Sequence, residues 1–541
     1  MMGWRARSPR APTQRPGIEE ADVAEVVMPE TLRDWMDHHA AARAGQPACI
    51  GPHGVISYAA LHQQALAFAG AFRAHGLGKG DVIAVQLPNG LAFLQCYLAA
   101  GSIGAVLQTI HMPYRAADIE PLLRHARAKA VICLAEARDV SPAALVLSLR
   151  QSLPDLRLVV AVGPNAPDGA MAFEALASGP GTPPDDRPQP GDRFVLLYTS
   201  GTTAAPKGVP VPYARFLANA RLSAAELGID GSSVLLSAAP FSHLYGLFSI
   251  NLALSAGAAT AVLPAFTPVS LAAALDSHRP TGLFVAPAHL AGCLNEGLLT
   301  PDRLSSLRFV LISGSACPPE LARALQDLMP EGKVCQLWGM SEMQAGSFTR
   351  PGDAEPVRLT SVGRASPGTE LRVADGTEPL PVGTEGELQV RGISVFDGYL
   401  DNPSATAEAF SADGWFRTGD LARLDEHGHL TITGRSKEVI NRGGVKFNPA
   451  DVEALIARHP AVEICAIVPM PDPVLGERAC CFVVLHAGAG IDLDKLRAWL
   501  ARHDVAKTKW PERLELIDEM PMTPTRKIKK AELAKRVAGS G

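Results

Sequence analysis

A segment rich in hydroxyl groups and glycine stands directly after an apolar run. This segment, YTSGTTAAPKG, occupies residues 198–208 and follows FVLL. Hydroxyl groups and backbone N–H groups can donate hydrogen bonds to phosphate oxygens, and Lys207 adds a mobile positive charge. The segment therefore predicts an anion-binding loop. Its composition alone favours a flexible Ser/Thr/Gly loop, and the Walker pattern GxxxxGK[ST] is absent from the chain.

Four further polar segments follow in order. SGSACP begins at residue 313 after the apolar run FVLI, and WGMSE begins at residue 338. GWFRTGD (414–420) precedes LTITGRSKEVINRGG (430–444). Taken singly, these residues have ordinary explanations: a glutamate at a solvated helix start, an aspartate in a turn, arginines and lysines on the surface. Their order along one chain is what makes the pattern specific.

Together these segments resemble the adenylate-forming superfamily, which contains acyl-CoA synthetases, adenylation domains and luciferases. The resemblance covers the chain from about residue 30 onward. It implies an α/β fold: a large N-terminal domain of two doubly wound α/β subdomains plus a β-barrel-like subdomain, followed by a small α+β C-terminal domain. The expected parts are a disordered tail (1–25), a large AMP-binding domain (26–433), a hinge (434–437) and a small mobile domain (438–541).

The resemblance also implies an ATP site. Trp338 falls where an aromatic ring stacks on adenine, in place of the commoner Tyr. Ser341 and Glu342 match the pair that contacts the α-phosphate and Mg²⁺, a cation that prefers oxygen ligands. Asp420 matches the aspartate that accepts both ribose hydroxyl groups, and Arg435 matches a residue on the ribose or phosphate side. The implied ATP- and AMP-binding residues are Thr199, Ser200, Gly201, Thr202, Thr203, Lys207, Gly314, Ser315, Ala316, Trp338, Gly339, Ser341, Asp420 and Arg435.

Two more matches concern catalysis and domain movement. His243, in PFSHLYGL, matches the histidine at the mouth of the acyl pocket, and Lys527 matches the lysine that the small domain inserts for adenylation. The chain has Arg526 where the family usually has Gly, and a plain basic patch would also explain MTPTRKIKK. Lys437 matches the hinge position. The implied catalytic residues are Lys527, His243, Thr199, Lys207 and Glu342.

The implied reaction joins a carboxylic acid to ATP, giving acyl-AMP and pyrophosphate, and then passes the acyl group to a thiol. Gly443 and Gly444 lie where small residues let a pantetheine arm pass close to the backbone. Coenzyme A is the expected acceptor, because no carrier-protein domain follows in this chain. The alternatives are an adenylation enzyme that loads a separate carrier protein and, in another class, a non-catalytic acyl-nucleotide binder. The expected cofactors are ATP, Mg²⁺ and coenzyme A.

The acyl pocket is expected to be small and apolar. Relatives that adenylate 2-hydroxylated benzoates typically place Asn directly after the histidine, whereas this chain has Leu244. An apolar acid is therefore expected, whether alicyclic, unsubstituted aromatic or medium-chain aliphatic. The implied pocket residues are His243, Leu244, Gly246 and Ala286, together with the SGSA segment.

Alternating helices and strands must position these residues. Residues 31–134 alternate between the two, with a helix over 61–76 and a strand over 81–89, which indicates a parallel, doubly wound sheet. No Asp, Glu, Lys or Arg occurs in residues 231–275. Pro240, His243, Asn251 and Pro264 interrupt this stretch, so we interpret it as a buried strand–helix–strand unit with its helix over 244–254, not a membrane span.

The pattern of predicted elements changes again further along the chain. Residues 178–192 are rich in Gly, Pro and Asp and predict a loop. A second α/β run follows, and after about residue 362 short strands and turns predict an antiparallel unit. A small α+β domain is expected from near Gly434.

Bulk composition narrows the class of protein. The 541 residues carry a formal net charge of -5, which does not favour nucleic acid as a partner. Nine cysteines are scattered without CxxC spacing, which argues against a disulfide framework or a zinc site and suits a cytoplasmic location. The first 17 residues contain Arg and Pro but no apolar run, so they predict no secretory signal.

Overall fold

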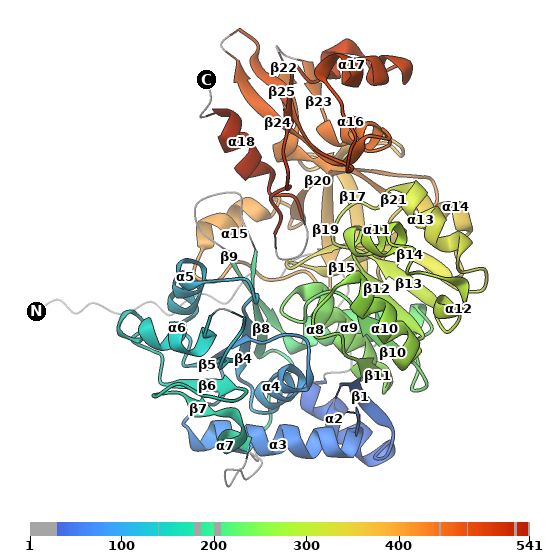
Figure 1. Cartoon of the computed structure of the whole chain (residues 1–541). Helices are drawn as coiled ribbons and strands as arrows, with labels where there is room; N and C mark the ends of the chain where they lie inside the picture. The colour runs from blue at the N-terminus through green and yellow to red at the C-terminus, as the bar shows by residue number, and fades with distance from the viewer. Residues whose placement is uncertain are drawn as a thin grey trace, which may run out of the picture.

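Three sheets build a large N-terminal domain, and a fourth builds a small C-terminal domain (Figure 1). In the computed structural model, the described residues are 30–52, 54–138, 140–177, 186–199, 207–442, 445–472, 474–523 and 527–538. The predicted tail and most of the predicted loop over 178–192 lie outside them. The expected α/β class, with its large and small domains, is confirmed.

The first subdomain is a seven-stranded sheet in the order β7-β6-β5-β3-β4-β8-β9. Its strands from β6 to β8 pair in parallel, as the alternating pattern predicts, and β9 pairs antiparallel to β8. The strands are β3 (Val82–Gln86), β4 (Val106–Thr109), β5 (Ala130–Leu134), β6 (Leu158–Val162), β7 (Met171–Ala172), β8 (Arg193–Thr199) and β9 (Lys207–Pro212). Its helices are α3 (Tyr58–Ala74), α4 (Leu91–Ser102), α5 (Ala116–Ala126), α6 (Pro142–Ser148) and α7 (Phe173–Ala177).

The second subdomain is a nine-stranded sheet in the order β16-β15-β14-β13-β12-β10-β11-β1-β2. The strands are β1 (Pro47–Gly51), β2 (Gly54–Ser57), β10 (Val234–Ser237), β11 (Ala259–Ala261), β12 (Gly282–Val285), β13 (Phe309–Ile312), β14 (Lys333–Met340), β15 (Gln344–Phe348) and β16 (Arg364–Ala365). The helices are α2 (Leu32–Ala42), α8 (Tyr213–Glu226), α9 (Leu244–Ala256), α10 (Pro268–His278), α11 (Pro287–Asn295), α12 (Pro301–Leu304), α13 (Pro319–Asp327) and α14 (Glu355–Thr360).

The long uncharged stretch is a buried strand–helix–strand unit, as predicted. Helix α9 joins the parallel neighbours β10 and β11, and its residues from Leu244 to Leu254 are all buried. Gly257 ends the helix in the left-handed conformation, with φ 67°. Among the described residues, no helix is long and apolar enough to cross a membrane.

The third sheet is antiparallel, in the order β18-β17-β19-β20-β21. It matches the predicted change of texture, and its pairing runs from β18 to β21 without closing into a ring among the described residues. The strands are β17 (Thr369–Asp375), β18 (Glu378–Pro379), β19 (Gly386–Gly392), β20 (Phe416–Leu424) and β21 (Leu430–Arg435), and α15 (Pro403–Ala409) lies between β19 and β20.

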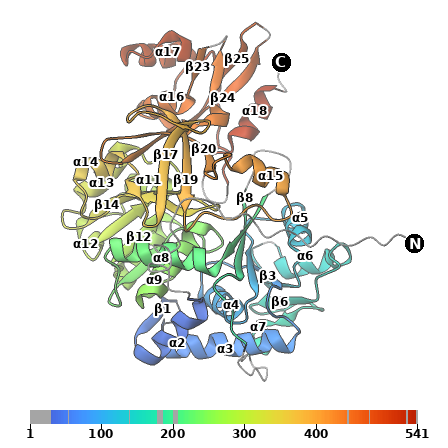
Figure 2. The same ribbon diagram turned by 180° about the vertical axis from the view of Figure 1, so that it is seen from behind.

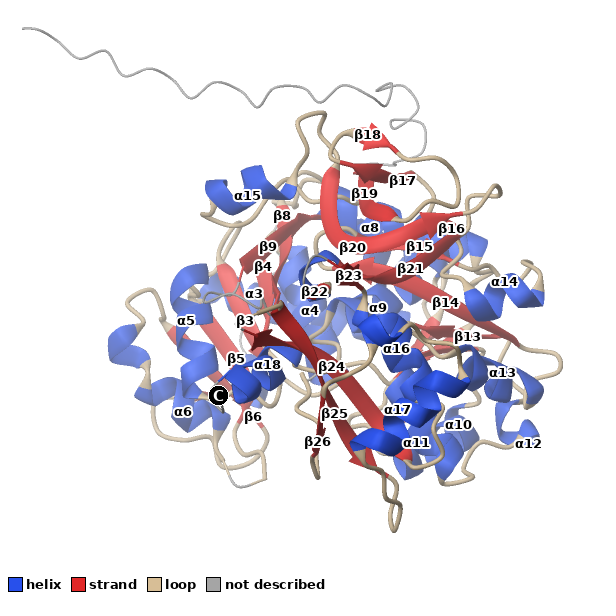
Figure 3. Cartoon of the chain, turned by 90° about the horizontal axis from the view of Figure 1, so that it is seen from above, coloured by secondary structure: helices blue, strands red, loops and turns tan. Residues whose placement is uncertain are grey.

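The small domain sits at one end of the molecule, beyond β17 and β20 (Figures 1 and 2). A 3₁₀ turn, η2 (Ser436–Glu438), leads into it from β21. Viewed from above, β24, β25, α16 and α17 lie over the large domain (Figure 3). Its elements are β22 (Ile440–Arg442), β23 (Val445–Phe447), α16 (Pro449–Ile456), β24 (Val462–Asp472), β25 (Gly476–Leu485), α17 (Leu493–Arg502), β26 (Arg513–Leu516) and α18 (Lys530–Ala538).

A network of ion pairs ties three segments of the small domain together. Lys530, at the start of α18, places Nζ 2.8 Å from Glu438 Oε2 of η2 and 2.9 Å from Glu453 Oε1 of α16. Glu453 Oε1 also accepts a hydrogen bond from the backbone N–H of Ile467 at 2.5 Å. Burial raises the pKa of Glu453, while the positive charge of Lys530 opposes that rise. The network fixes the start of α18 relative to η2.

We expect Lys530→Met to destabilise the small domain by up to about 3 kcal/mol, because it leaves the Glu453 carboxylate buried without a counter-charge. The loss should shrink as pH falls, since protonation of a carboxyl with a raised folded-state pKa then favours the folded state. Chemical denaturation at several pH values measures both effects. Lys529→Met, at an exposed neighbouring position, is the control, and equal destabilisation by the two variants would contradict the expectation.

Candidate active site

The predicted site residues converge from segments far apart in the sequence. They lie at the end of β8, the start of α9, the end of β14, the β20–β21 hairpin and the segment before α18. Asn89 helps to join the two α/β subdomains here: its side chain donates to the Ala239 carbonyl at 3.0 Å and accepts from the Phe241 N–H at 2.6 Å. This contact holds the turn that carries His243.

The ends of the threonine-rich loop are paired across two antiparallel strands. Thr199, the last residue of β8, lies opposite Lys207, the first of β9. This register fixes where the chain leaves the sheet and where it returns. The predicted phosphate-binding residues Ser200, Gly201, Thr202 and Thr203 lie outside the described residues.

Tyr399 links Lys207 to Glu342. The Lys207 ammonium lies over the Tyr399 ring, 4.7 Å from its centroid, and the Tyr399 hydroxyl donates to Glu342 Oε1 at 3.0 Å. A backbone hydrogen bond of 2.8 Å from Leu400 to Gly208 joins the Tyr399 segment to β9. Sequence reasoning missed Tyr399. The sequence DGYL carries no chemical signature, so only the fold places its ring between the lysine and the carboxylate.

The Glu342 carboxylate is buried, with 6% of the residue exposed. Burial raises its pKa, whereas the Tyr399 hydrogen bond and the charges of Arg435 and Lys207 oppose that rise. Mg²⁺ is commonly held by one or two carboxylates together with substrate phosphates. Glu342 fits this donor set, and no cluster of three or more potential metal ligands occurs among the described residues.

Asp420 is held by two protein donors. Its Oδ2 accepts from Trp338 Nε1 at 2.8 Å, and its Oδ1 lies 2.9 Å from Arg435 Nε. Asp420 and Arg435 are direct partners across β20 and β21, so the hairpin register sets their distance. Burial raises the pKa of Asp420, and the positive charge of Arg435 is the largest opposing influence. The structure thus brings together three residues predicted to contact one nucleotide.

Lys527 enters this group from the small domain. Its backbone exchanges hydrogen bonds with Thr523, from Lys527 N to Thr523 Oγ1 at 3.0 Å and from Thr523 N to the Lys527 carbonyl at 2.7 Å. Burial lowers the pKa of the Lys527 ammonium and so does the charge of Arg435, whereas Asp420 and Glu342 raise it. The side chain therefore lies within electrostatic reach of both site carboxylates. Arg526 lies outside the described residues.

His243 caps helix α9 and lies beside a second histidine. Its Nδ1 accepts the Tyr245 N–H at 3.2 Å, so the neutral ring carries its proton on Nε2. Burial lowers its pKa well below the usual range, and Lys527 lowers it further. The His111 ring stacks at a centroid distance of 6.2 Å, and burial lowers the pKa of His111 to about 4. Two neutral imidazoles thus face each other.

A small cavity adjoins these rings. His111, which the sequence reasoning missed, forms a hydrogen bond through its Nδ1 with Ser242 Oγ at 2.9 Å. The hydroxyl of Tyr198, another lining residue, lies 2.9 Å from His125 Nδ1. The structure brings Leu244 and His243, predicted for the acyl pocket, and Ser341, predicted for the nucleotide, to one cavity. The lining residues are Thr109, His111, Tyr114, Leu122, Leu197, Tyr198, Ser242, His243, Leu244 and Ser341.

The other predicted pocket residues lie close by without lining that cavity. A Cβ on Gly246 would meet the Pro240 carbonyl oxygen at 2.1 Å, so close backbone packing requires glycine there. A Cβ on Gly314 would lie 3.7 Å from Ala286 Cβ, which puts the ends of β12 and β13 side by side. Gly314 has φ +100°, a conformation that favours glycine, while Ser315 and Ala316 are exposed. Their contact with an acyl group or adenine stays a prediction.

The hinge and thiol predictions rest on fewer observations. Lys437 is exposed in η2, between the last strand of the large domain and the first strand of the small one. Gly443 and Gly444 lie outside the described residues.

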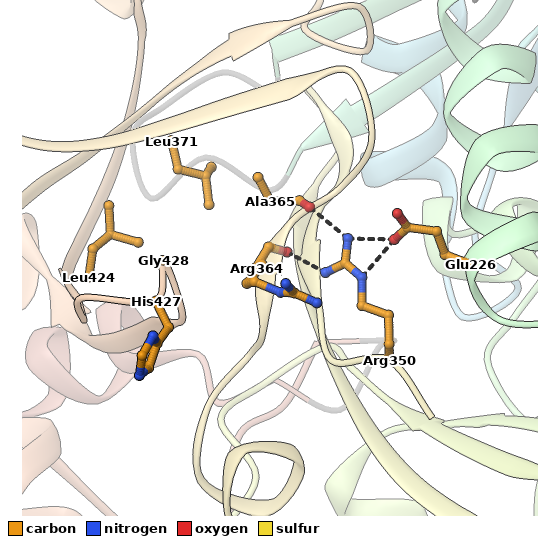
Figure 4. A pocket seen from close by; sticks show the side chains of 8 residues that line it. All are labelled: Glu226, Arg350, Arg364, Ala365, Leu371, Leu424, His427 and Gly428. Atoms are coloured by element: carbon orange, nitrogen blue, oxygen red, sulfur yellow. Dashed lines mark hydrogen bonds and ion pairs between the residues drawn. The ribbon is translucent and has the colours of Figure 1, made fainter. Parts of the chain in front are cut away.

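A second hollow lies at the turn end of the β20–β21 hairpin (Figure 4). Arg350 lines one side of it, pairing with Glu226 and donating to the carbonyls of Arg364 and Ala365. Asp420 and Arg435 lie at the opposite end of the hairpin. All three guanidinium nitrogens of Arg350 already bond to protein groups, so we assign this hollow no part in the chemistry.

Comparison with known proteins agrees with this geometry. The family model described as AMP-binding enzyme matches residues 36–400, and the model described as AMP-binding enzyme C-terminal domain matches residues 451–527. This chain belongs to the AMP-binding enzyme family. The resemblance inferred from the motifs is thereby confirmed, and the chain is an adenylate-forming ligase by family.

Proteins named for different carboxylic acids are similar to this chain. The medium-chain fatty-acid–CoA ligase of Escherichia coli is 33% identical over 94% of this chain and 90% of its own length. A salicyl-AMP ligase / salicyl-S-ArCP synthetase of Mycobacterium tuberculosis is also 33% identical, over 96% of this chain and 92% of its own length. The crystal structure of ATP-bound MatB from Rhodopseudomonas palustris superposes with a TM-score of 0.83 at 26% identity, covering 94% and 99% of the two chains.

We expect Tyr399→Phe to shift the acid limb of the pH–rate profile for adenylation to higher pH. The variant loses the hydroxyl that holds down the pKa of Glu342, so that carboxylate is protonated at a higher pH and no longer serves as a ligand. Acid-dependent ATP–pyrophosphate exchange between pH 5 and 9 measures the shift. Tyr114→Phe is the control, since its hydroxyl is not bonded to Glu342. An unchanged acid limb in Tyr399→Phe would contradict the assignment.

Proposed function

We propose that this chain activates a carboxylic acid with ATP and transfers the acyl group to coenzyme A. In the first step the carboxylate oxygen attacks the α-phosphorus, and the bond from that phosphorus to pyrophosphate breaks. In the second step the thiol sulfur attacks the acyl carbon, AMP leaves and the thiol proton is released. The position of Lys527 is the observation that carries the proposal, because it brings a cation of the small domain to Asp420 and Glu342.

The first step must bring two anions together, so its main requirement is charge stabilisation. Lys207 enters from β9 and Lys527 from the small domain, and neither is a nucleophile in this reaction. Two unit charges 4 Å apart interact by about 4 kcal/mol at an effective dielectric of 20. Mg²⁺ held at Glu342 would neutralise part of the phosphate charge. His243 offers a neutral Nε2–H donor at the edge of the same site.

The second step needs a different face of the small domain. We propose that the segment with Gly443 and Gly444 forms the thiol path and that the small domain rotates about Lys437 between the steps. The η2 turn supports this, since none of its three residues is buried. Coenzyme A is the first choice of acceptor. A carrier-protein thiol is the alternative, because some relatives at the same identity are named as carrier-protein synthetases.

A non-catalytic acyl-nucleotide binder is the rival from another class. Such a protein would have no need for a small-domain lysine within electrostatic influence of two buried carboxylates. The convergence of Lys527, Glu342 and Asp420 therefore favours catalysis.

We expect Lys527→Ala to slow acyl-adenylate formation at least a hundredfold, equivalent to about 2.7 kcal/mol of lost transition-state stabilisation. Thioester formation from supplied acyl-AMP should be largely spared, since Lys527 acts in the first step. Pyrophosphate release and thioester formation, measured separately, test this, with exposed Lys529→Ala as the control. Equal losses in the two half-reactions, or no loss in either, would refute the role.

The side chains beside His243 bear on which acid is bound. Leu244 is buried with 6% exposed and has no hydrogen-bonding group. The neighbouring polar side chains His111 and Tyr198 already bond to other protein groups. An ortho hydroxyl on a benzoate that packs against Leu244 would find no partner on that side chain, and an unsatisfied hydroxyl costs about 1–3 kcal/mol. We therefore propose an apolar alicyclic, aromatic or medium-chain acid as substrate.

We expect benzoate, cyclohexanecarboxylate or octanoate to exceed salicylate and 2,3-dihydroxybenzoate by roughly tenfold or more in kcat/KM. Pyrophosphate release across this panel, with and without coenzyme A, measures acid and acceptor preference together. Leu244→Asn should raise the relative activity on salicylate, because the amide can bond the ortho hydroxyl. A wild-type preference for salicylate would show that Leu244 does not face the acid.

A further inference from the structure

Trp338 makes a polar contact that base stacking does not require. Its indole Nε1–H donates to Asp420 Oδ2 at 2.8 Å, from the end of β14 to the middle of β20. The indole is held in place from its other side, since a Cβ on Gly346 would meet Trp338 Cζ3 at 2.5 Å. A ring packed this closely can hold the acceptor in a fixed orientation.

The carboxylate of Asp420 has spare capacity. Its two oxygens offer about four acceptor positions, of which Trp338 takes one on Oδ2 and Arg435 one on Oδ1. Only 5% of the side chain is exposed, so water can do little to fill the remainder. One free position on each oxygen matches a pair of adjacent hydroxyl groups.

The two existing partners differ in rigidity. The Arg435 side chain is 54% exposed at the end of a hairpin, whereas Trp338 is packed within the large domain. With Arg435 alone, the carboxylate could turn about its Cβ–Cγ bond while keeping one ion pair. The indole N–H removes that freedom.

We propose that Trp338 is a positioning residue for nucleotide binding: its N–H orients Asp420 so that the free acceptor positions receive the two ribose hydroxyl groups. The inference rests on the proposed function and on the match of Asp420 to the family aspartate that accepts both ribose hydroxyl groups. Preorganised acceptors bind more tightly because no orientational freedom is lost on binding. The opposite arrangement, in which the indole N–H competes with ribose for Oδ2, predicts tighter binding once the N–H is removed.

The test compares ATP with 2′,3′-dideoxy-ATP, which lacks both hydroxyl groups, by titration calorimetry on the full-length protein. We expect Trp338→Phe to weaken ATP binding about tenfold and to leave the affinity for dideoxy-ATP close to its wild-type value. The ratio of the two affinities, which measures discrimination by the ribose hydroxyl groups, should therefore fall about tenfold. Trp415→Phe, the same change at an indole packed between Arg372 and Arg391, is the control and should keep wild-type discrimination.

A second variant guards against a folding defect. Replacement of Trp338 by β-(3-benzothienyl)alanine keeps the bicyclic shape and substitutes sulfur for the N–H, and it should lower discrimination to the same extent. Equal weakening of both nucleotides, or tighter ATP binding, in either variant would overturn the positioning role. Asp420→Asn separates the two claims: if it leaves the wild-type discrimination intact, the ribose assignment within the proposed function fails, whatever Trp338 does.

Discussion

Two buried carboxylates, Glu342 and Asp420, impose the main constraint on this molecule. A carboxylate removed from water is costly unless it is paired and hydrogen-bonded. Each has partners from separate segments: the Tyr399 hydroxyl and the nearby charge of Lys207 for Glu342, and the Trp338 N–H and the Arg435 guanidinium for Asp420. These pairings hold the ends of β9, β14 and the β20–β21 hairpin at one place. The same pairings leave a site whose fixed charges suit a polyanionic nucleotide.

The small domain completes this balance of charge. Lys527 is stabilised in its ionised form by the two carboxylates and destabilised by burial and by Arg435. Because these influences oppose one another, the stability of the Lys527 ammonium in the site depends on what is bound. The negative charge of a bound phosphate would stabilise the ammonium there. The Lys530–Glu438–Glu453 network transmits any movement of the η2 turn to the segment that carries Lys527. In the proposed rotation, this network would keep the start of α18 fixed relative to η2.

Apolar packing surrounds this polar centre and determines what can enter it. Leu244 begins a helix that is buried from end to end, and Gly246 is forced to be small by the Pro240 carbonyl. The start of α9 beside His243 is therefore closely packed, and Leu244 presents no polar group to the cavity that Thr109, Tyr114 and Ser341 also line. In the proposed function, this packing would select an acid by its shape.

Much of this protein could be predicted from the sequence. The period of apolar residues identified the parallel strands and the buried α9 unit, because strands covered on both faces lose their polar alternation. The order of the motifs identified the family, and it singled out Glu342, Trp338, Asp420 and Arg435. The structure places Trp338 and Arg435 on Asp420. What only the tertiary structure decided are contacts between residues distant in sequence with no motif of their own: Tyr399 between Lys207 and Glu342, His111 against His243, and the Trp338 N–H on Asp420. Such contacts depend on strand register and on how the domains pack, and the local pattern of the sequence determines neither.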